Sequence, residues 1–169
     1  LYVPDFPDLP MEEVYPREAP RGAAVIAREH PGGGRTVYIP WNIGAIFWEV
    51  LAGDHARLIA NAVGWALGAR PAVEVEGRGV FDLSVREGDG TTVVLVNNLT
   101  NPMMMKGPIR EVYPVGPVTV SVAVPPGRTV RRVHLVSAGD EVEFALADGR
   151  VRASIGQLTT LEAIQFDWG

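Results

Sequence analysis

Residues 118–124 read Val-Thr-Val-Ser-Val-Ala-Val, so valine occupies every second position. Successive side chains of a strand point to opposite faces, and this alternation therefore predicts a strand with one buried face. Clusters of similar length and β-branched composition recur from residue 71 to residue 169. Turn residues separate them, for example at Pro125–Gly127 and Asp148–Gly149. About eight short strands at this spacing predict an antiparallel β-sandwich over residues 71–169.

Residues 1–70 follow a different pattern. The first twenty residues contain five prolines and predict an extended arm, because proline has no amide hydrogen to donate within a helix. Two short apolar runs at 23–27 and 36–40 flank Pro31-Gly32-Gly33-Gly34, which predicts a hairpin.

Helical periodicity follows the predicted hairpin. Residues 46–51 predict a short helical turn, and apolar residues at three-to-four spacing from Leu58 to Ala66 predict a longer helix. Asp54 is expected to accept its first amide hydrogen bonds, and Gly68 and Pro71 to end it. The fold class is therefore α+β, with one domain over 1–70 and a second over 71–169.

Charge and composition exclude several classes of function. The net charge of −5 is spread over both halves of the chain, which leaves no basic surface for nucleic acid. No apolar run reaches the roughly 18 residues of a membrane span. With no cysteine and three scattered histidines, the chain has no metal-ligand spacing, and we assign no metal or cofactor. We expect a soluble protein of the bacterial cytoplasm, although no residue pattern specifies the compartment.

No catalytic constellation stands out. Glycoside hydrolysis uses two carboxylates about 5 to 10 Å apart, and twenty acidic residues offer many coincidental pairs. Pairs such as Glu74 and Glu76 fall on alternating strand positions, where a solvated face is the simpler interpretation. No serine lies in a Gly-x-Ser-x-Gly elbow, and we assign no catalytic residue.

The loop after residue 96 offers candidates for an interface. Met103, Met104 and Met105 are consecutive and lie between Pro102 and Gly107. Thioether side chains adapt to irregular surfaces, so the three could contact a partner, with Lys106 and Arg110 at the rim. A loop that packs its own methionines under the end of the sandwich explains the pattern equally well.

Four other residues are candidates for carbohydrate contact. Trp41 and Trp48 belong to an aromatic cluster, and aromatic rings stack on sugars as readily as they fill cores. Asn98 and Asn101 could line a polar ledge for a saccharide. The simpler alternatives are a core or interface role for the tryptophans, and turn-closing hydrogen bonds for the asparagines.

Two segments resemble parts of known families. Residues 38–44, Phe47-Trp48 and residues 54–66 resemble the end of the trimerisation domain of the large bacterial β-galactosidases, a domain similar to class I glutamine amidotransferases. Residues 96–108 and 115–117 resemble the C-terminal β-domain of glycoside hydrolases that carry this trimerisation domain.

The resemblance implies that the catalytic carboxylates lie in an upstream (β/α)8 barrel and that residues 1–70 close an amidotransferase-like α/β domain. Amidotransferase activity itself needs a nucleophilic cysteine, which the chain lacks. Leu1 is not an initiator methionine, and we expect a part of a longer protein.

Three hypotheses follow for the function. In the first, the chain is a non-catalytic assembly region whose partner is the rest of the parent polypeptide or another subunit, including a homo-oligomer. In the second, it is a carbohydrate-binding β-sandwich module with a saccharide as ligand. In the third, it is a freestanding protein that self-associates through its methionines.

Overall fold

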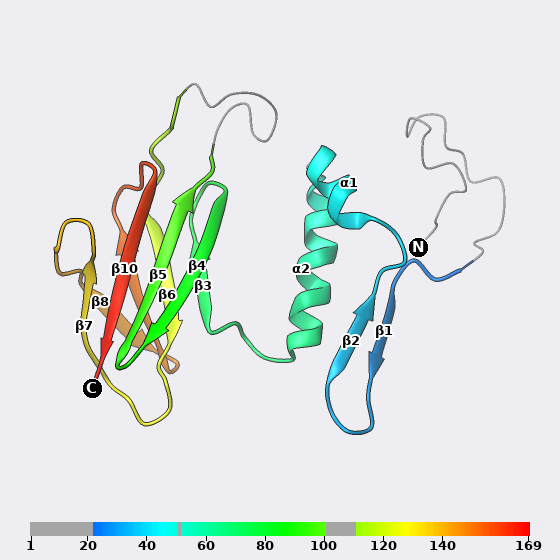
Figure 1. Ribbon diagram of the computed structural model, residues 1–169, viewed down its shortest axis with the longest axis horizontal. Coiled ribbons are helices and arrows are strands. Elements are labelled where there is room, and N and C mark those ends of the chain that lie inside the picture. Colours follow the sequence, from blue (N-terminus) through cyan, green and yellow to red (C-terminus); the bar gives the residue numbers. More distant parts are fainter. Residues whose placement is uncertain (1–21, 51, 101–110) are drawn as a thin grey trace. The chain divides into compact units, whose positions relative to one another are not determined.

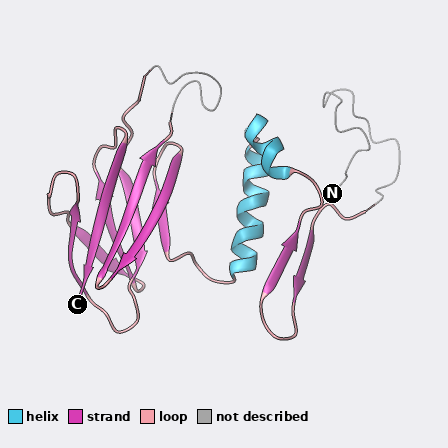
Figure 2. Ribbon diagram, viewed as in Figure 1, coloured by secondary structure: helices cyan, strands magenta, loops and turns pink. Residues whose placement is uncertain are grey.

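The structure is a computed structural model that describes residues 22–50, 52–100 and 111–169. The chain divides into two compact units, Leu1–Pro71 (unit 1) and Ala72–Gly169 (unit 2). Figure 1 shows the elements of both units, and Figure 2 shows that the helices belong to unit 1 whereas the described part of unit 2 consists of strands and loops.

Unit 1 begins with the predicted hairpin. Strands β1 (Ile26–Glu29) and β2 (Arg35–Tyr38) pair antiparallel, with Ile26 opposite Tyr38 and Glu29 opposite Arg35. The turn between them needs positive φ angles, which glycine adopts without steric cost, and Gly33 and Gly34 both have φ of 86°. The prediction of a hairpin around these glycines is confirmed.

Helices α1 (Ile43–Val50) and α2 (Gly53–Leu67) complete unit 1. The carbonyl of Asn42 accepts the amide hydrogen of Ile46 at 3.1 Å at the start of α1. Gly68 ends α2 as predicted, with φ of 65° and its N–H donated to the Gly64 carbonyl.

The predicted cap of α2 is wrong. The N-cap is Ala52, which makes no side-chain hydrogen bond, and Asp54 lies one residue inside the helix. From there the Asp54 carboxylate lies 3.5 Å from Arg57. Asp54 still places a negative charge in the first turn, where the helix dipole favours it.

Unit 2 contains two four-stranded antiparallel sheets. The first has the order β4-β5-β10-β7 and the second β3-β6-β9-β8. Their strands are β3 (Val73–Glu76), β4 (Phe81–Gly88), β5 (Thr91–Asn98), β6 (Val118–Ala123), β7 (Val130–Leu135), β8 (Phe144–Ala147), β9 (Arg150–Ile155) and β10 (Leu161–Trp168). Each predicted strand of the sandwich has a counterpart among these eight, so this part of the prediction is confirmed.

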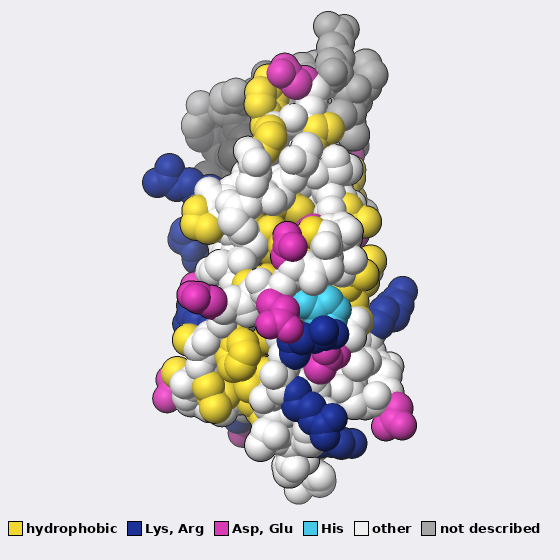
Figure 3. Space-filling model, turned by 90° about the vertical axis from the view of Figure 1, so that its left-hand side faces the viewer, with side chains coloured by type: hydrophobic (Ala, Val, Ile, Leu, Met, Phe, Trp, Pro, Cys, Tyr) yellow, Lys and Arg dark blue, Asp and Glu magenta, His cyan; other side chains and the backbone are white. Residues whose placement is uncertain are grey.

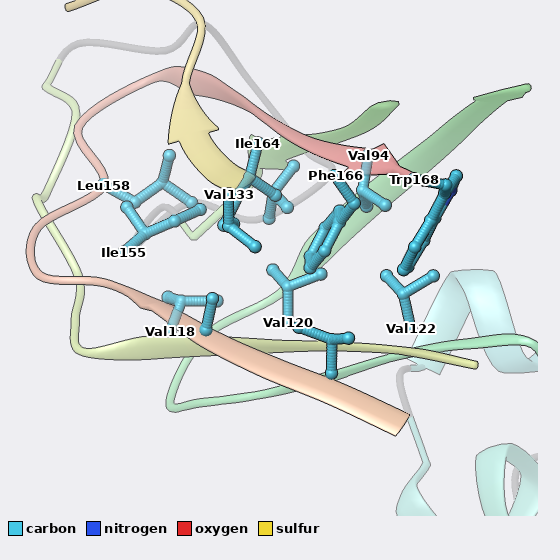
Figure 4. Close-up of a cluster of buried hydrophobic side chains, with 13 residues drawn as sticks. Val94, Val118, Val120, Val122, Val133, Ile155, Leu158, Ile164, Phe166 and Trp168 are labelled. Carbon is cyan, nitrogen blue, oxygen red and sulfur yellow. The ribbon is translucent and has the colours of Figure 1, made fainter. Parts of the chain in front are cut away.

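The core of unit 2 lies between its two sheets. Thirteen buried hydrophobic residues form one cluster, to which β6 contributes Val118, Val120 and Val122, the alternating valines of the opening motif. In Figure 4, Val118 lies toward Ile155 and Leu158, whereas Val120 and Val122 are directed toward Phe166 and Trp168 of β10. These two rings stack with centroids 6.1 Å apart, which adds a specific aromatic contact to the buried apolar area.

Candidate interaction sites

Trp41 is held within unit 1. Its indole N–H donates to the carbonyl of Ala24 at 2.9 Å, and its ring meets His55 edge-on at a centroid distance of 5.6 Å. Because Ala24 precedes β1 and His55 lies on α2, Trp41 ties two segments of unit 1 together. Trp48 differs, since 55% of its surface is exposed on α1. Of the two tryptophans, Trp48 presents more surface to a ligand.

Asn98 is a buried residue of unit 2 whose side chain hydrogen-bonds to separate segments of the chain. Only 7% of its surface is exposed, and its side-chain amide donates to the carbonyls of Tyr113 and Thr159, both at 2.8 Å. Its side-chain oxygen accepts the Thr100 amide hydrogen at 3.0 Å. The end of β5 is thereby joined to two other segments of the chain. The polar atoms of Asn98 are thus engaged by backbone groups of its own unit.

The other predicted contact residues lie outside the described residues. They are Asn101, Met103, Met104, Met105, Lys106 and Arg110. Trp41 and Trp48 belong to unit 1 and Asn98 to unit 2, so the described candidates are discussed unit by unit.

Helix α2 leaves an apolar stripe uncovered within unit 1. None of its residues is buried, and Val63 and Leu67 are 61% and 52% exposed. Ala60, Val63, Gly64 and Leu67 recur at three-to-four spacing and therefore share one side of the helix, which we call the α2 apolar face. A methyl group added at Gly64 would have no neighbour within 4 Å. Contiguous apolar surface of this kind is typical of interaction sites.

The outer face of the second sheet is polar and internally paired. Arg150 on β9 is 6% exposed, and it donates from Nε to Ser121 Oγ at 2.9 Å and from Nη2 to the Ser121 carbonyl at 3.0 Å. Its guanidinium also lies 3.6 Å from the Glu74 carboxylate. Two residues further along β9, the guanidinium of Arg152 lies 2.9 Å from the carboxylate of Glu76. The two glutamates therefore pair with arginines across the sheet, as structural residues do.

A shallow hollow of about 620 Å³ lies beside strand β8. Its lining consists of Thr119, residues 142–145 and residues 152–154. The hydroxyls of Thr119 and Ser154 lie 3.0 Å apart, so each is in reach of a hydrogen bond from the other. Sequence reasoning missed this site, because nothing in the sequence shows which strands form the edges of a sheet.

A cluster of ionisable side chains occupies the outer face of the first sheet. Asp167 on β10 accepts hydrogen bonds from Arg132 at 3.1 Å and from Gln165 at 2.7 Å, and His134 Nδ1 lies 3.7 Å away. Burial opposes the ionised form of Asp167, but these hydrogen bonds and the charge of Arg132 outweigh it, so the pKa of Asp167 is lowered. The cluster is a structural ion network between neighbouring strands β7 and β10.

The described residues also bear on metals and membranes. Within residues 22–50, 52–100 and 111–169, no group of three or more His, Cys, Asp or Glu side chains is placed to hold a metal ion. Across the same ranges, no helix has the length and apolar character needed to cross a membrane.

Comparison with known proteins gives a likeness of fold. No family model matches the chain, and no curated protein is significantly similar in sequence. Among solved structures, an α-L-fucosidase isoenzyme 2 from Paenibacillus thiaminolyticus is similar, with a TM-score of 0.66 and 19% identity. The match covers 90% of this chain and 23% of that chain. This chain therefore shares its fold with part of a much longer glycoside hydrolase, and the match extends beyond unit 2 into unit 1.

Proposed function

We propose that this chain is a non-catalytic support and assembly region of a larger glycoside hydrolase-like protein. In this proposal the catalytic barrel belongs to another part of the parent polypeptide, and unit 1 is the closing portion of an amidotransferase-like domain of the β-galactosidase trimerisation type. The partner is the rest of that polypeptide or another subunit, including another copy of this chain.

The observation that carries the proposal is the small number of buried hydrophobic residues in the described part of unit 1. Among its described hydrophobic residues only Ala24 and Ile43 are buried, whereas α2 exposes Val63 and Leu67. An isolated two-stranded hairpin is marginally stable in water, and unit 1 contains one such hairpin and two helices in its described part. A neighbouring apolar surface would supply the burial that these elements lack.

The fold likeness supports the same proposal. The fucosidase chain is a named glycoside hydrolase, and this chain corresponds to less than a quarter of it. A region of this size can accompany a catalytic domain without containing it. The β-galactosidase-like character and the trimeric assembly rest on the resemblance of residues 38–66 and remain parts of the proposal.

The proposal is tested at the α2 apolar face. A Val63→Glu substitution introduces a charge where we expect the partner to pack, and should weaken association with the remaining parent polypeptide at least tenfold. Asn61→Glu is the matched control, because it adds the same charge to an exposed position of the same helix. Binding is measured by titration calorimetry. Equal binding by both variants would exclude the α2 apolar face as the interface.

Activity measurements test the non-catalytic assignment separately. The purified chain should not hydrolyse aryl α-L-fucosides or aryl β-D-galactosides. Robust turnover that persists through repeated purification would refute the assignment even if the chain also binds a partner.

The alternative is a carbohydrate-binding module, which the exposure of Trp48 favours. Stacking of a sugar on this ring should quench its fluorescence in a saturable way, and Trp48→Ala should abolish the change. Asn98 does not enter this alternative as a ligand, since its amide is committed to backbone carbonyls.

A further inference from the structure

Strand β8 is an edge strand of four residues whose side chains are uncharged and exposed, so short length is the one usual protection that it has. It lies at the end of the second sheet, so one side of its backbone pairs with β9 and the other side has no strand beside it in the described residues. Unpaired amide and carbonyl groups along such an edge are a template for another strand. Natural edges are normally protected by charges, short length or a covering segment.

The other three edge strands of unit 2 show these protections. Strand β4 carries Asp82, Arg86 and Glu87, and β3 carries Glu74 and Glu76. Strand β7 is covered at one end by the following segment, where Val142 donates to the Val133 carbonyl and Leu135 donates to the Asp140 carbonyl, both at 2.9 Å. Strand β8 reads Phe-Ala-Leu-Ala and has no charge.

Apolar side chains of β8 are also exposed. Phe144 pairs with Ala153 and Leu146 with Val151, which places both on the core side of the sheet, yet they are 41% and 62% exposed. Figure 3 views the molecule from the side on which β7 and β8 lie in Figure 1, and it shows hydrophobic side chains at the surface among charged ones. An added strand would cover this apolar surface.

The hollow beside β8 is placed to accept side chains of a strand that pairs with β8. It adjoins residues 142–145 and extends over the outer face toward Thr119, Arg152 and Ser154. Strand addition gains affinity from main-chain hydrogen bonds and specificity from pockets that take alternate side chains. The edge of β8 and the hollow together meet both requirements.

Charges at the two ends of β8 select the occupant. Glu143 precedes the strand, Asp148 follows it, and both are exposed. In an antiparallel pairing of β8 with a second copy centred on the strand, Glu143 would lie opposite Asp148 at both ends, and like charges opposite each other destabilise a sheet. A strand with basic residues at its ends would meet opposite charges instead.

We propose that the β8 edge, together with the adjoining hollow, binds an extended segment of a partner protein in which alternating apolar residues are flanked by lysine or arginine. The main chain of that segment adds a fifth strand to the second sheet. This inference concerns unit 2 alone and does not depend on the proposed role of unit 1.

A synthetic peptide that alternates valine and threonine between terminal lysines is the probe. We expect it to bind the full 169-residue chain, to shift the amide NMR signals of residues 142–147, and to slow hydrogen exchange along β8. A peptide with glutamate in place of lysine should bind about tenfold more weakly, because two attractive charge pairs, one at each end of β8, become repulsive. The lysine peptide with methylated backbone amides should not bind, because those amides can no longer donate main-chain hydrogen bonds.

Paired variants test the residues. Glu143→Gln with Asp148→Asn removes both charges while keeping a residue type that tolerates the positive φ of 52° at position 148. This variant should lose the preference for the lysine peptide, whereas Asp82→Asn with Glu87→Gln on β4 should retain it. Equal binding of lysine and glutamate peptides to the unmodified chain, signal shifts at β4 or α2, or dimerisation through β8 without peptide would each overturn the proposal.

Discussion

Among the asparagines in the described part of unit 2, Asn98 should cost the most stability when it is replaced by alanine. The substitution removes hydrogen bonds to the carbonyls of Tyr113 and Thr159 and from the amide of Thr100, at 2.8, 2.8 and 3.0 Å. Each neutral hydrogen bond contributes about 0.5–1.5 kcal/mol net. Because the site is 7% exposed, water replaces these partners poorly, and we expect a loss of about 3 kcal/mol in unfolding free energy.

Replacement by aspartate gives a sharper test, because the side chain keeps its shape and loses its donors. A carboxylate oxygen would then face the carbonyl oxygens of Tyr113 and Thr159, which disfavours the ionised form and should raise the pKa of the new group above its usual value of about 3.9. A raised pKa in the folded state means that stability is greatest below the ordinary pKa and declines as pH rises through the folded pKa. Asn98→Asp should therefore be less stable at pH 7 than at pH 4, relative to the unmodified chain at each pH.

Urea unfolding followed by far-UV circular dichroism measures both effects. Asn97→Ala is the matched control, because Asn97 is the neighbouring position on the opposite face of β5, and its cost should stay within about 0.5 kcal/mol. The reasoning is refuted if Asn98→Ala costs less than about 1 kcal/mol, or if the relative stability of Asn98→Asp increases with pH.

Two further predictions concern stability. The lowered pKa of Asp167 means that its contribution is present above the ordinary carboxyl pKa and is lost as pH falls through the folded value, so Asp167→Asn should flatten the acid limb of a pH–stability profile. Urea titrations from pH 7 to pH 2.5 would show an unchanged limb if the ion network with Arg132 contributes nothing. Phe166→Ala should cost about 3–5 kcal/mol in denaturant unfolding because the ring is fully buried. Leu161→Ala, at a 53% exposed position of the same strand, should cost less than about 1 kcal/mol, and similar losses for both would contradict the assigned core.

The sandwich could be predicted from sequence because its signal is local. Alternating valines predict one buried face of a strand, and Val118, Val120 and Val122 are all buried as the pattern predicts. Ser121 is also buried, at 1% exposure, although the alternation places it on the outer face. The guanidinium of Arg150 engages it there, 29 residues away in sequence. Such a contact depends on the register between β6 and β9, which no single stretch of sequence encodes.

The sites were less predictable because they depend on strand order. In the sequence, Asn98 is a residue type that is common in turns and in sugar-binding sites. Only the fold shows that its side-chain amide donates to the carbonyl of Thr159, 61 residues away. Likewise, Phe144 and Leu146 read as ordinary core residues of a strand. Their exposure arises because β8 ends its sheet, and that position is decided by the pairing of β6 with β9 and of β9 with β8.

The described parts of the two units differ in how many hydrophobic residues they bury. Unit 2 encloses thirteen hydrophobic residues between two sheets and so has a core of its own. In the described part of unit 1, Ala24 and Ile43 alone are buried among the hydrophobic residues, and the helix α2 has none. Burial of apolar surface is the main favourable term in folding, so unit 1 gains most from an external partner. A partner that covers α2 would therefore stabilise unit 1 in proportion to the apolar area that it removes from water.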